Sequence, residues 1–164
     1  MSTLIANGTL VDGNGGAPRV ASVFVSAGKI EAVGDDALRR AAAYENDGRE
    51  VCERFDATGL TVMPGLIDAH CHLAFDDAES NSELFFQRRN ALSALVASYN
   101  ARKLLRAGVT GILDPDSTFE NMIDLRDAIN AGVVPGPRMA CGAYALITSV
   151  GGTAGRLIAD SGVT

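Results

Sequence analysis

The alternation of apolar and polar positions predicts β-strands in the first third of the chain. Up to about residue 62, short apolar runs alternate with glycine-rich turns, a pattern typical of a small antiparallel sheet. Within residues 19–35, Ala27 and Gly28 supply the turn between two such runs. The charged, alanine-rich residues 35–50 are expected to form a short surface helix or a loop.

A long helix is predicted after an apolar strand at residues 66–73. Ser80 to Glu83 has the S-x-x-E pattern of a capping box, and Gly108 stands where a helix-ending glycine belongs. Several large side chains between these signals can share one broad helical face. They are Leu84, Leu92, Leu95, Val96, Tyr99 and Leu105.

Two further strands and a second helix follow. Residues 109–114 form an apolar run, and Ser117 to Glu120 repeats the capping box before a helix that ends near Gly132. Residues 138–146 form the third run. The order from residue 66 is therefore β-α-β-α-β, and its strands are too apolar to have a free face. This pattern predicts a parallel sheet or barrel with helices outside.

Composition restricts the class of partner. The chain has 14 Lys plus Arg against 20 Asp plus Glu, so its net charge of −6 argues against nucleic acid or an anionic membrane. Small molecules or other proteins remain. No apolar window approaches a membrane span, and the N-terminus lacks the features of a signal peptide, so a cytoplasmic protein is expected. The three cysteines, Cys52, Cys71 and Cys141, are expected to be reduced thiols.

Both histidines of the chain lie in the stretch "MPGLIDAHCHL". In a strand, residues two apart face the same side, so His70 and His72 should project together, with Asp68 one step behind. Neutral imidazole suits zinc and similar divalent ions, and the pair supplies two of the three or four protein ligands of a catalytic site. Two unrelated histidines are the less favoured alternative. We therefore predict a metal site.

The neighbours of the histidines carry weaker predictions. Cys71 should face the opposite side and serve packing rather than metal binding. Asp68 either orients a ligand histidine as an outer-sphere partner or caps the strand, and the pattern leaves both interpretations open. Asp76, Asp77 and Glu79 are expected to be solvated loop charges.

A second candidate region follows residues 109–114. Asp114 and Asp116 would lie at the rim where parallel-sheet enzymes collect functional groups, where they could bind substrate or act as acid or base. Turn formation by Asp-Pro-Asp-Ser is the favoured interpretation. Thr148 and Thr153, in the glycine-rich loop 148–155, are further candidates for substrate binding. That loop lacks the Lys-Ser/Thr ending of a phosphate-binding loop.

Four ordered segments resemble the amidohydrolase superfamily. "MPGLIDAHCHL" resembles its proline-glycine lead into a strand bearing His-x-His. Residues 56–65 resemble the first part of its small β-sandwich, and residues 104–114 its helix-to-second-strand segment. Residues 136–152 resemble the third strand of its imidazolonepropionase- and prolidase-like branch, except that Thr153 stands where many relatives have histidine.

The resemblance implies an α/β fold in which residues 63–164 form the N-terminal part of a (β/α)8 TIM barrel, about three strands. Residues 1–62 would be β-sandwich strands preceding it. It also implies that His70 and His72 bind one or two divalent ions, Zn²⁺ or another transition metal. The implied activity is hydrolysis of an amide, urea, carbamate or related C–N bond of a small molecule by metal-activated water.

Completion of the barrel requires more than this chain. A TIM barrel has eight strands, and two histidines do not complete a catalytic zinc site. We therefore expect a second polypeptide that completes the barrel and carries the catalytic residues, within a hetero-oligomer of higher order. Two alternatives stay open. One is a non-catalytic metal-binding or regulatory half-barrel docked on a full-length homologue, and the other is an inactive truncated product.

Overall fold

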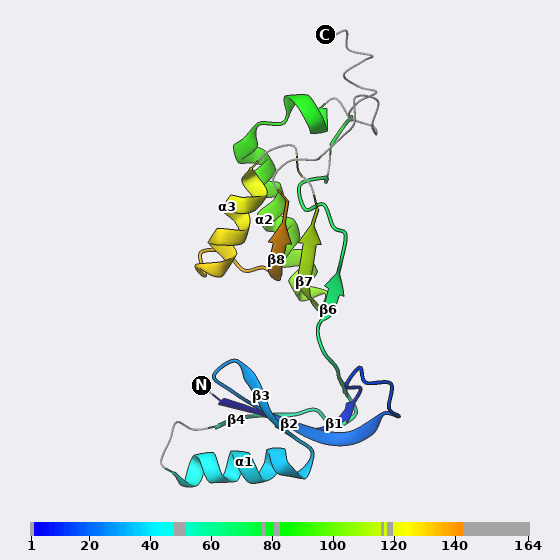
Figure 1. The fold of residues 1–164 in the computed structure, drawn as a ribbon, viewed down its shortest axis with the longest axis vertical. Helices are drawn as coiled ribbons and strands as arrows, with labels where there is room; N and C mark the ends of the chain where they lie inside the picture. Colours follow the sequence, from blue (N-terminus) through cyan, green and yellow to red (C-terminus); the bar gives the residue numbers. More distant parts are fainter. Residues whose placement is uncertain are drawn as a thin grey trace. The chain divides into compact units, whose positions relative to one another are not determined.

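The computed structural model describes residues 2–47, 52–76, 78–80, 83–115, 117 and 120–142. The chain divides into two compact units, Met1–Pro64 and Gly65–Thr164 (Figure 1). The first unit contains a mixed sheet and one helix, and the second contains a parallel sheet with helices.

The sheet of the first unit has five strands. They are β1 (Ser2–Leu10), β2 (Arg19–Ser26), β3 (Lys29–Val33), β4 (Cys52–Asp56) and β5 (Thr61–Val62). Strands β1, β2 and β3 pair antiparallel, with Ala27 and Gly28 in the β2–β3 turn, as predicted. Strands β4 and β5, however, pair parallel to β1, so the expectation of a purely antiparallel sheet is wrong. The reason is that α1 carries the chain from β3 to β4 as a crossover.

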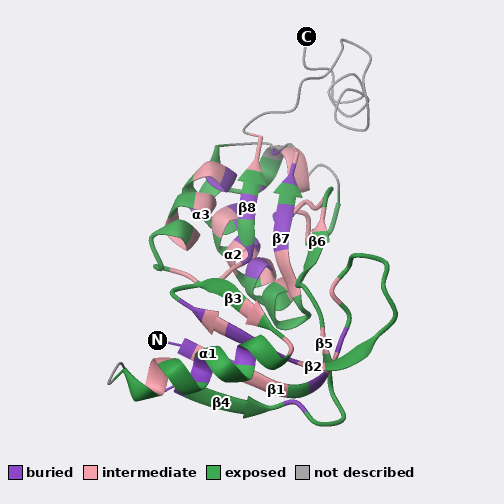
Figure 2. Ribbon diagram, turned by 60° about the horizontal axis from the view of Figure 1, so that its bottom comes forward, coloured by how far each residue is buried: buried purple, intermediate pink, exposed green. Residues whose placement is uncertain are grey.

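Helix α1 (Asp35–Asn46) confirms the helical interpretation of the charged, alanine-rich segment. Its Ala37 and Ala41 are fully buried and join Leu4 and Phe24 of the sheet in one core (Figure 2). The small alanine side chains let the helix approach the sheet closely. The other side of the helix keeps its charges in water.

The second unit has the predicted β-α-β-α-β order. Its elements are β6 (Leu66–Asp68), the π-helical turn η1 (Glu83–Gln87), α2 (Asn90–Arg106), β7 (Val109–Asp114), α3 (Asn121–Asn130) and β8 (Arg138–Cys141). The strands pair in the order β6-β7-β8, all parallel (Figure 1). Because the strands are parallel, their carboxyl ends meet at one edge of the sheet.

The helix boundaries differ from the two predicted capping boxes. Ser80 Oγ accepts a hydrogen bond from Glu83 N–H at 3.1 Å, but this bond begins η1, and α2 starts later, after Arg89. Helix α3 starts after Glu120 without a side-chain cap, so the prediction that Ser117 caps it is wrong. Ser117 Oγ instead lies 3.1 Å from Asn121 Oδ1. The prediction that a glycine ends this helix is confirmed, because α2 ends just before Gly108, whose φ is 91°.

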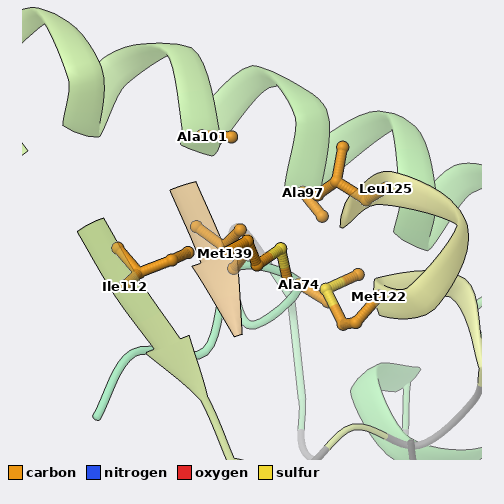
Figure 3. Close-up of a cluster of buried hydrophobic side chains, with 8 residues drawn as sticks. Ala74, Ala97, Ala101, Ile112, Met122, Leu125 and Met139 are labelled. Atoms are coloured by element: carbon orange, nitrogen blue, oxygen red, sulfur yellow. The ribbon is translucent and has the colours of Figure 1, made fainter. Parts of the chain in front are cut away.

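The buried face of α2 is not the predicted one. Ser93, Ala97 and Ala101 are buried, whereas Leu95 is 69% exposed and Tyr99 55% exposed. Large side chains fill space, but small ones permit the close approach of α2 to β7 and α3. Ala97 and Ala101 point into a core shared with β7, α3 and β8 (Figure 3). That core holds the strands whose carboxyl ends form the candidate site.

Candidate metal centre

The two histidines follow strand β6 rather than lie in it. The strand ends at Asp68, whose Oδ1 accepts a hydrogen bond from His70 N–H at 3.1 Å. Strand periodicity therefore does not orient the imidazoles, contrary to the sequence argument. The segment is anchored on the neighbouring strand instead, because Cys71 N–H donates to Leu113 O at 2.9 Å.

The imidazoles of His70 and His72 nevertheless converge. Their Nε2 atoms are 3.1 Å apart, and the ring planes meet at 80°. Two nitrogens that each lie about 2.0–2.1 Å from a tetrahedral zinc ion are separated by about 3.3–3.4 Å. The observed spacing thus fits two adjacent positions of such an ion. Nitrogen donors of this kind suit zinc and other borderline divalent metals.

Aromatic packing fixes the ring plane of His72. Its side chain is 24% exposed and stacks on Phe75, with centroids 4.6 Å apart and planes 11° from parallel. Phe75 in turn meets Phe85 edge to face at 5.3 Å. The His72 imidazole is therefore held in one plane before any ligand binds.

Asp114 lies behind His72 at the carboxyl end of β7. Its side chain is 1% exposed, and Oδ1 is 3.9 Å from His72 Nδ1. Oδ2 accepts a hydrogen bond from Leu73 N–H at 3.1 Å, and the backbone oxygen accepts one from Gly142 N–H at 2.9 Å. Asp114 thus links the end of β7 to the segments that follow β6 and β8.

The three cysteines are free thiols. Cys71 packs against the core of the second unit, as predicted. Burial raises the pKa of the Cys71 thiol, and the negative charges of Asp68 and Asp114 raise this pKa further. A raised pKa favours the neutral thiol over the thiolate, which is the form that binds metals.

Arg88 is a residue that sequence reasoning missed. Its side chain is 5% exposed; Nη1 donates to the backbone oxygens of Ala74 and Asp76, both at 2.9 Å. Nε and Nη2 donate to the two carboxylate oxygens of Glu83 at 3.0 and 3.2 Å. This residue therefore fixes the loop that carries Phe75. No local pattern signals it, because the contacts span 5 to 14 positions.

Asp76 and Glu79 were expected to be solvated loop charges, and both reach the protein surface. Asp76 Oδ2 lies 3.4 Å from Lys103 Nζ at the surface, and Glu79 is exposed. A pocket of about 220 Å³ opens beside His72. It is lined by Cys71, His72, Leu73, Phe75, Asp76, Asn100, Lys103 and Leu104.

Part of the predicted site lies outside the described residues: Asp77, Asp116, Thr148 and Thr153. Within the part of the chain that the structure describes, no group of three or more His, Cys, Asp or Glu side chains is placed to hold a metal ion. His70 and His72 are thus the candidate metal ligands among the described residues. None of the helices in the described ranges is long and apolar enough to cross a membrane.

Comparison with known proteins shows the family and the fold of the chain. The model of the amidohydrolase family matches residues 61–160. A dihydroorotase of Ruminiclostridium cellulolyticum is 37% identical over 91 residues, which are 56% of this chain and 19% of that protein. An Escherichia coli allantoinase is 41% identical over 71 residues, 43% of this chain and 13% of that protein. The structure of molinate hydrolase superposes with a TM-score of 0.70 at 30% identity, covering 89% of this chain and 30% of that one.

The parallel strands of the second unit, covered by helices, define an α/β barrel as its class of fold. The chain belongs to the amidohydrolase family. The predicted fold class is confirmed: the second unit is the N-terminal part of a TIM barrel. The chain spans less than a fifth of the length of these curated relatives and under a third of molinate hydrolase.

Proposed function

We propose that this chain is part of a metal-dependent hydrolase that cleaves an amide, urea, carbamate or related C–N bond of a small molecule. One observation carries the proposal: the Nε2 atoms of His70 and His72 converge to 3.1 Å at the carboxyl end of β6. In TIM barrels this end of the strands holds the active site. Family membership supports the same reaction class.

The residues of this chain would hold and orient the ion. His70 and His72 offer their Nε2 atoms, and Phe75 keeps the His72 ring in its plane. When bound, a divalent ion acidifies a water molecule and polarises the carbonyl group under attack. A pocket of about 220 Å³ is lined by His72 on one side and by Asn100, Lys103 and Leu104 of α2 on the other.

We further propose that the remaining strands and ligands come from polypeptide outside these 164 residues. Two surfaces support this. In the described part of the sheet, β6 has one neighbouring strand, and Figure 2 shows β6 coloured mainly as exposed. Ile67 on this strand is 75% exposed. Leu95 and Tyr99 of α2 are also exposed. Apolar surfaces of this kind are normally covered in a closed barrel.

Replacement of the histidines tests the metal site. In the complete natural assembly, His70→Ala and His72→Ala should each lower the zinc content and abolish hydrolysis across a panel of small amides, ureas and carbamates. The loss of zinc affinity should exceed the about 10–100-fold that removal of an outer-shell partner causes. Asn130→Ala, at the exposed end of α3, is the control and should retain both properties.

Hydrolysis that survived both histidine substitutions would refute the enzymatic role of this chain. A wild-type assembly that held zinc at His70 and His72 but cleaved no member of the panel would favour the non-catalytic, metal-binding alternative. The zinc content and the turnover are measured on the same preparations, so the two results are separable.

A further inference from the structure

We infer that Asp114 is a positioning residue for His72, which it orients for metal binding through Nε2. The inference rests on the proposed function, because it assumes that His72 is a metal ligand. It assigns to Asp114 a role other than the turn formation or substrate binding that the sequence suggested.

The first support is the placement of Asp114 on both sides of His72. Oδ1 lies 3.9 Å from the imidazole Nδ1, and Oδ2 accepts a hydrogen bond from the backbone N–H of Leu73, the next residue. On the preceding side, Cys71 N–H donates a hydrogen bond to the backbone oxygen of Leu113, the residue before Asp114. The end of β7 therefore fixes the peptide before and after His72, and its carboxylate faces the ring.

The second support is the direction of the ring. Nδ1 is directed at the carboxylate, while Nε2 is directed at His70 Nε2. A neighbouring negative charge favours the tautomer with hydrogen on Nδ1, which leaves the Nε2 lone pair available to a metal. The separation of 3.9 Å is longer than a hydrogen bond, so in this structure the carboxylate acts on the ring as a nearby charge.

The third support is burial. Asp114 is 1% exposed, so a substrate in solution has almost no access to its carboxylate. An aspartate that serves only a turn needs no such burial. Asp68 offers the comparison within the same unit: its Oδ1 contacts the backbone N–H of His70 and ends the strand, in a more exposed position.

Asp114→Asn tests the inference in the full-length holoprotein. The amide keeps a carbonyl oxygen that can accept the Leu73 N–H bond, but it removes the charge that faces Nδ1. Zinc affinity, measured by competition with a chromophoric chelator, should fall by about 10–100-fold. The thermal midpoint of the metal-free protein should stay near that of wild type. Asp127→Asn, an exposed aspartate on α3, is the matched control and should change neither quantity.

A second measurement does not depend on the folding of a variant. In the ¹⁵N-histidine spectrum of the metal-free wild-type protein, neutral His72 should carry its hydrogen on Nδ1, because no bound metal then dictates the tautomer. A purely structural Asp114 would not determine this tautomer. A third measurement uses the variant: in cobalt-substituted Asp114→Asn, the visible ligand-field bands should change relative to wild type.

The outcomes separate the inference from the proposed function. If wild type holds zinc through both histidines but Asp114→Asn keeps wild-type affinity, the positioning role is refuted and the proposed function stands. Hydrogen on Nε2 of neutral His72 in the metal-free protein would refute the positioning role as well. If the wild-type assembly binds no zinc at His70 and His72, the proposed function and the inference both fail.

Discussion

At the scale of single residues, Gly65 shows why a proline-glycine pair precedes the histidines. The backbone at Gly65 passes directly beside β7, and a Cβ placed there would overlap Oγ1, Cγ2 and Cβ of Thr110. The following Leu66 N–H donates to Gly108 O at 2.9 Å, which aligns β6 with β7. The absence of a side chain at residue 65 thus permits the strand pairing that places His70 and His72.

Gly65→Ala should destabilise the second unit by about 1–3 kcal/mol, because the new methyl group overlaps a neighbour in a packed position. The measurement is the free energy of unfolding in urea. Gly16→Ala is the matched control, since a Cβ at Gly16 meets no atom within 4 Å and its φ is not left-handed. That control should change stability by less than about 0.5 kcal/mol. Equal effects of the two substitutions would refute the proposed contact.

At the scale of elements, the loop between β6 and α2 owes its shape to Arg88 on the far side of η1. Its guanidinium bonds two backbone oxygens and both oxygens of Glu83, which requires a planar group with several donors. Phe75 lies between the two bonded backbone oxygens in the sequence. The plane of His72 therefore depends on a residue outside the strand and outside the helix.

Arg88→Lys should lower stability by about 1.5–3 kcal/mol, because an ammonium group cannot make the same set of charge-assisted hydrogen bonds. Urea unfolding measures this change. Arg126→Lys alters an exposed ion pair with Asp127 and should cost no more than about 1 kcal/mol. If Arg88→Lys lowered the free energy of unfolding as little as Arg126→Lys does, the loop would hold its shape without Arg88.

At the scale of the whole molecule, three parallel strands form an open part of a barrel. The pairing stops at β6 and β8 in the described residues, and among those residues no group of three or more His, Cys, Asp or Glu is placed to hold a metal ion. A catalytic zinc site has three protein ligands or more. Further polypeptide would supply both the strands that pair with β6 and β8 and the remaining metal ligands.

The 164-residue chain expressed alone should therefore have no hydrolase activity and should hold zinc far more weakly than the complete assembly. Native mass spectrometry gives the chain and metal content, and the same chain within the assembly is the control. A stable monomer that unfolds cooperatively and shows full hydrolase activity would contradict the proposal that polypeptide outside these 164 residues completes the barrel.

Sequence patterns predicted much of this fold. The β7 strand over residues 109–114, the end of α2 at Gly108 and the parallel order all follow from local periodicity and turn chemistry. The orientation of α2 does not follow from these patterns, because hydrophobicity alone favoured the burial of Leu95 and Tyr99 over the burial of Ala97. Which face of a helix is buried depends on how closely its neighbours approach, and small residues decide that distance.

The sequence by itself determined the family, the order of elements and the histidine pair, because motifs and periodicity are properties of neighbouring residues. The tertiary structure decided how that pair is oriented. Asp114 reaches Leu73 across 41 positions, and Arg88 reaches Ala74 across 14. Contacts over such distances exist once β6 and β7 have paired and the loop between them has closed. The convergence of His70 and His72 therefore depends on the packing around them as well as on their spacing.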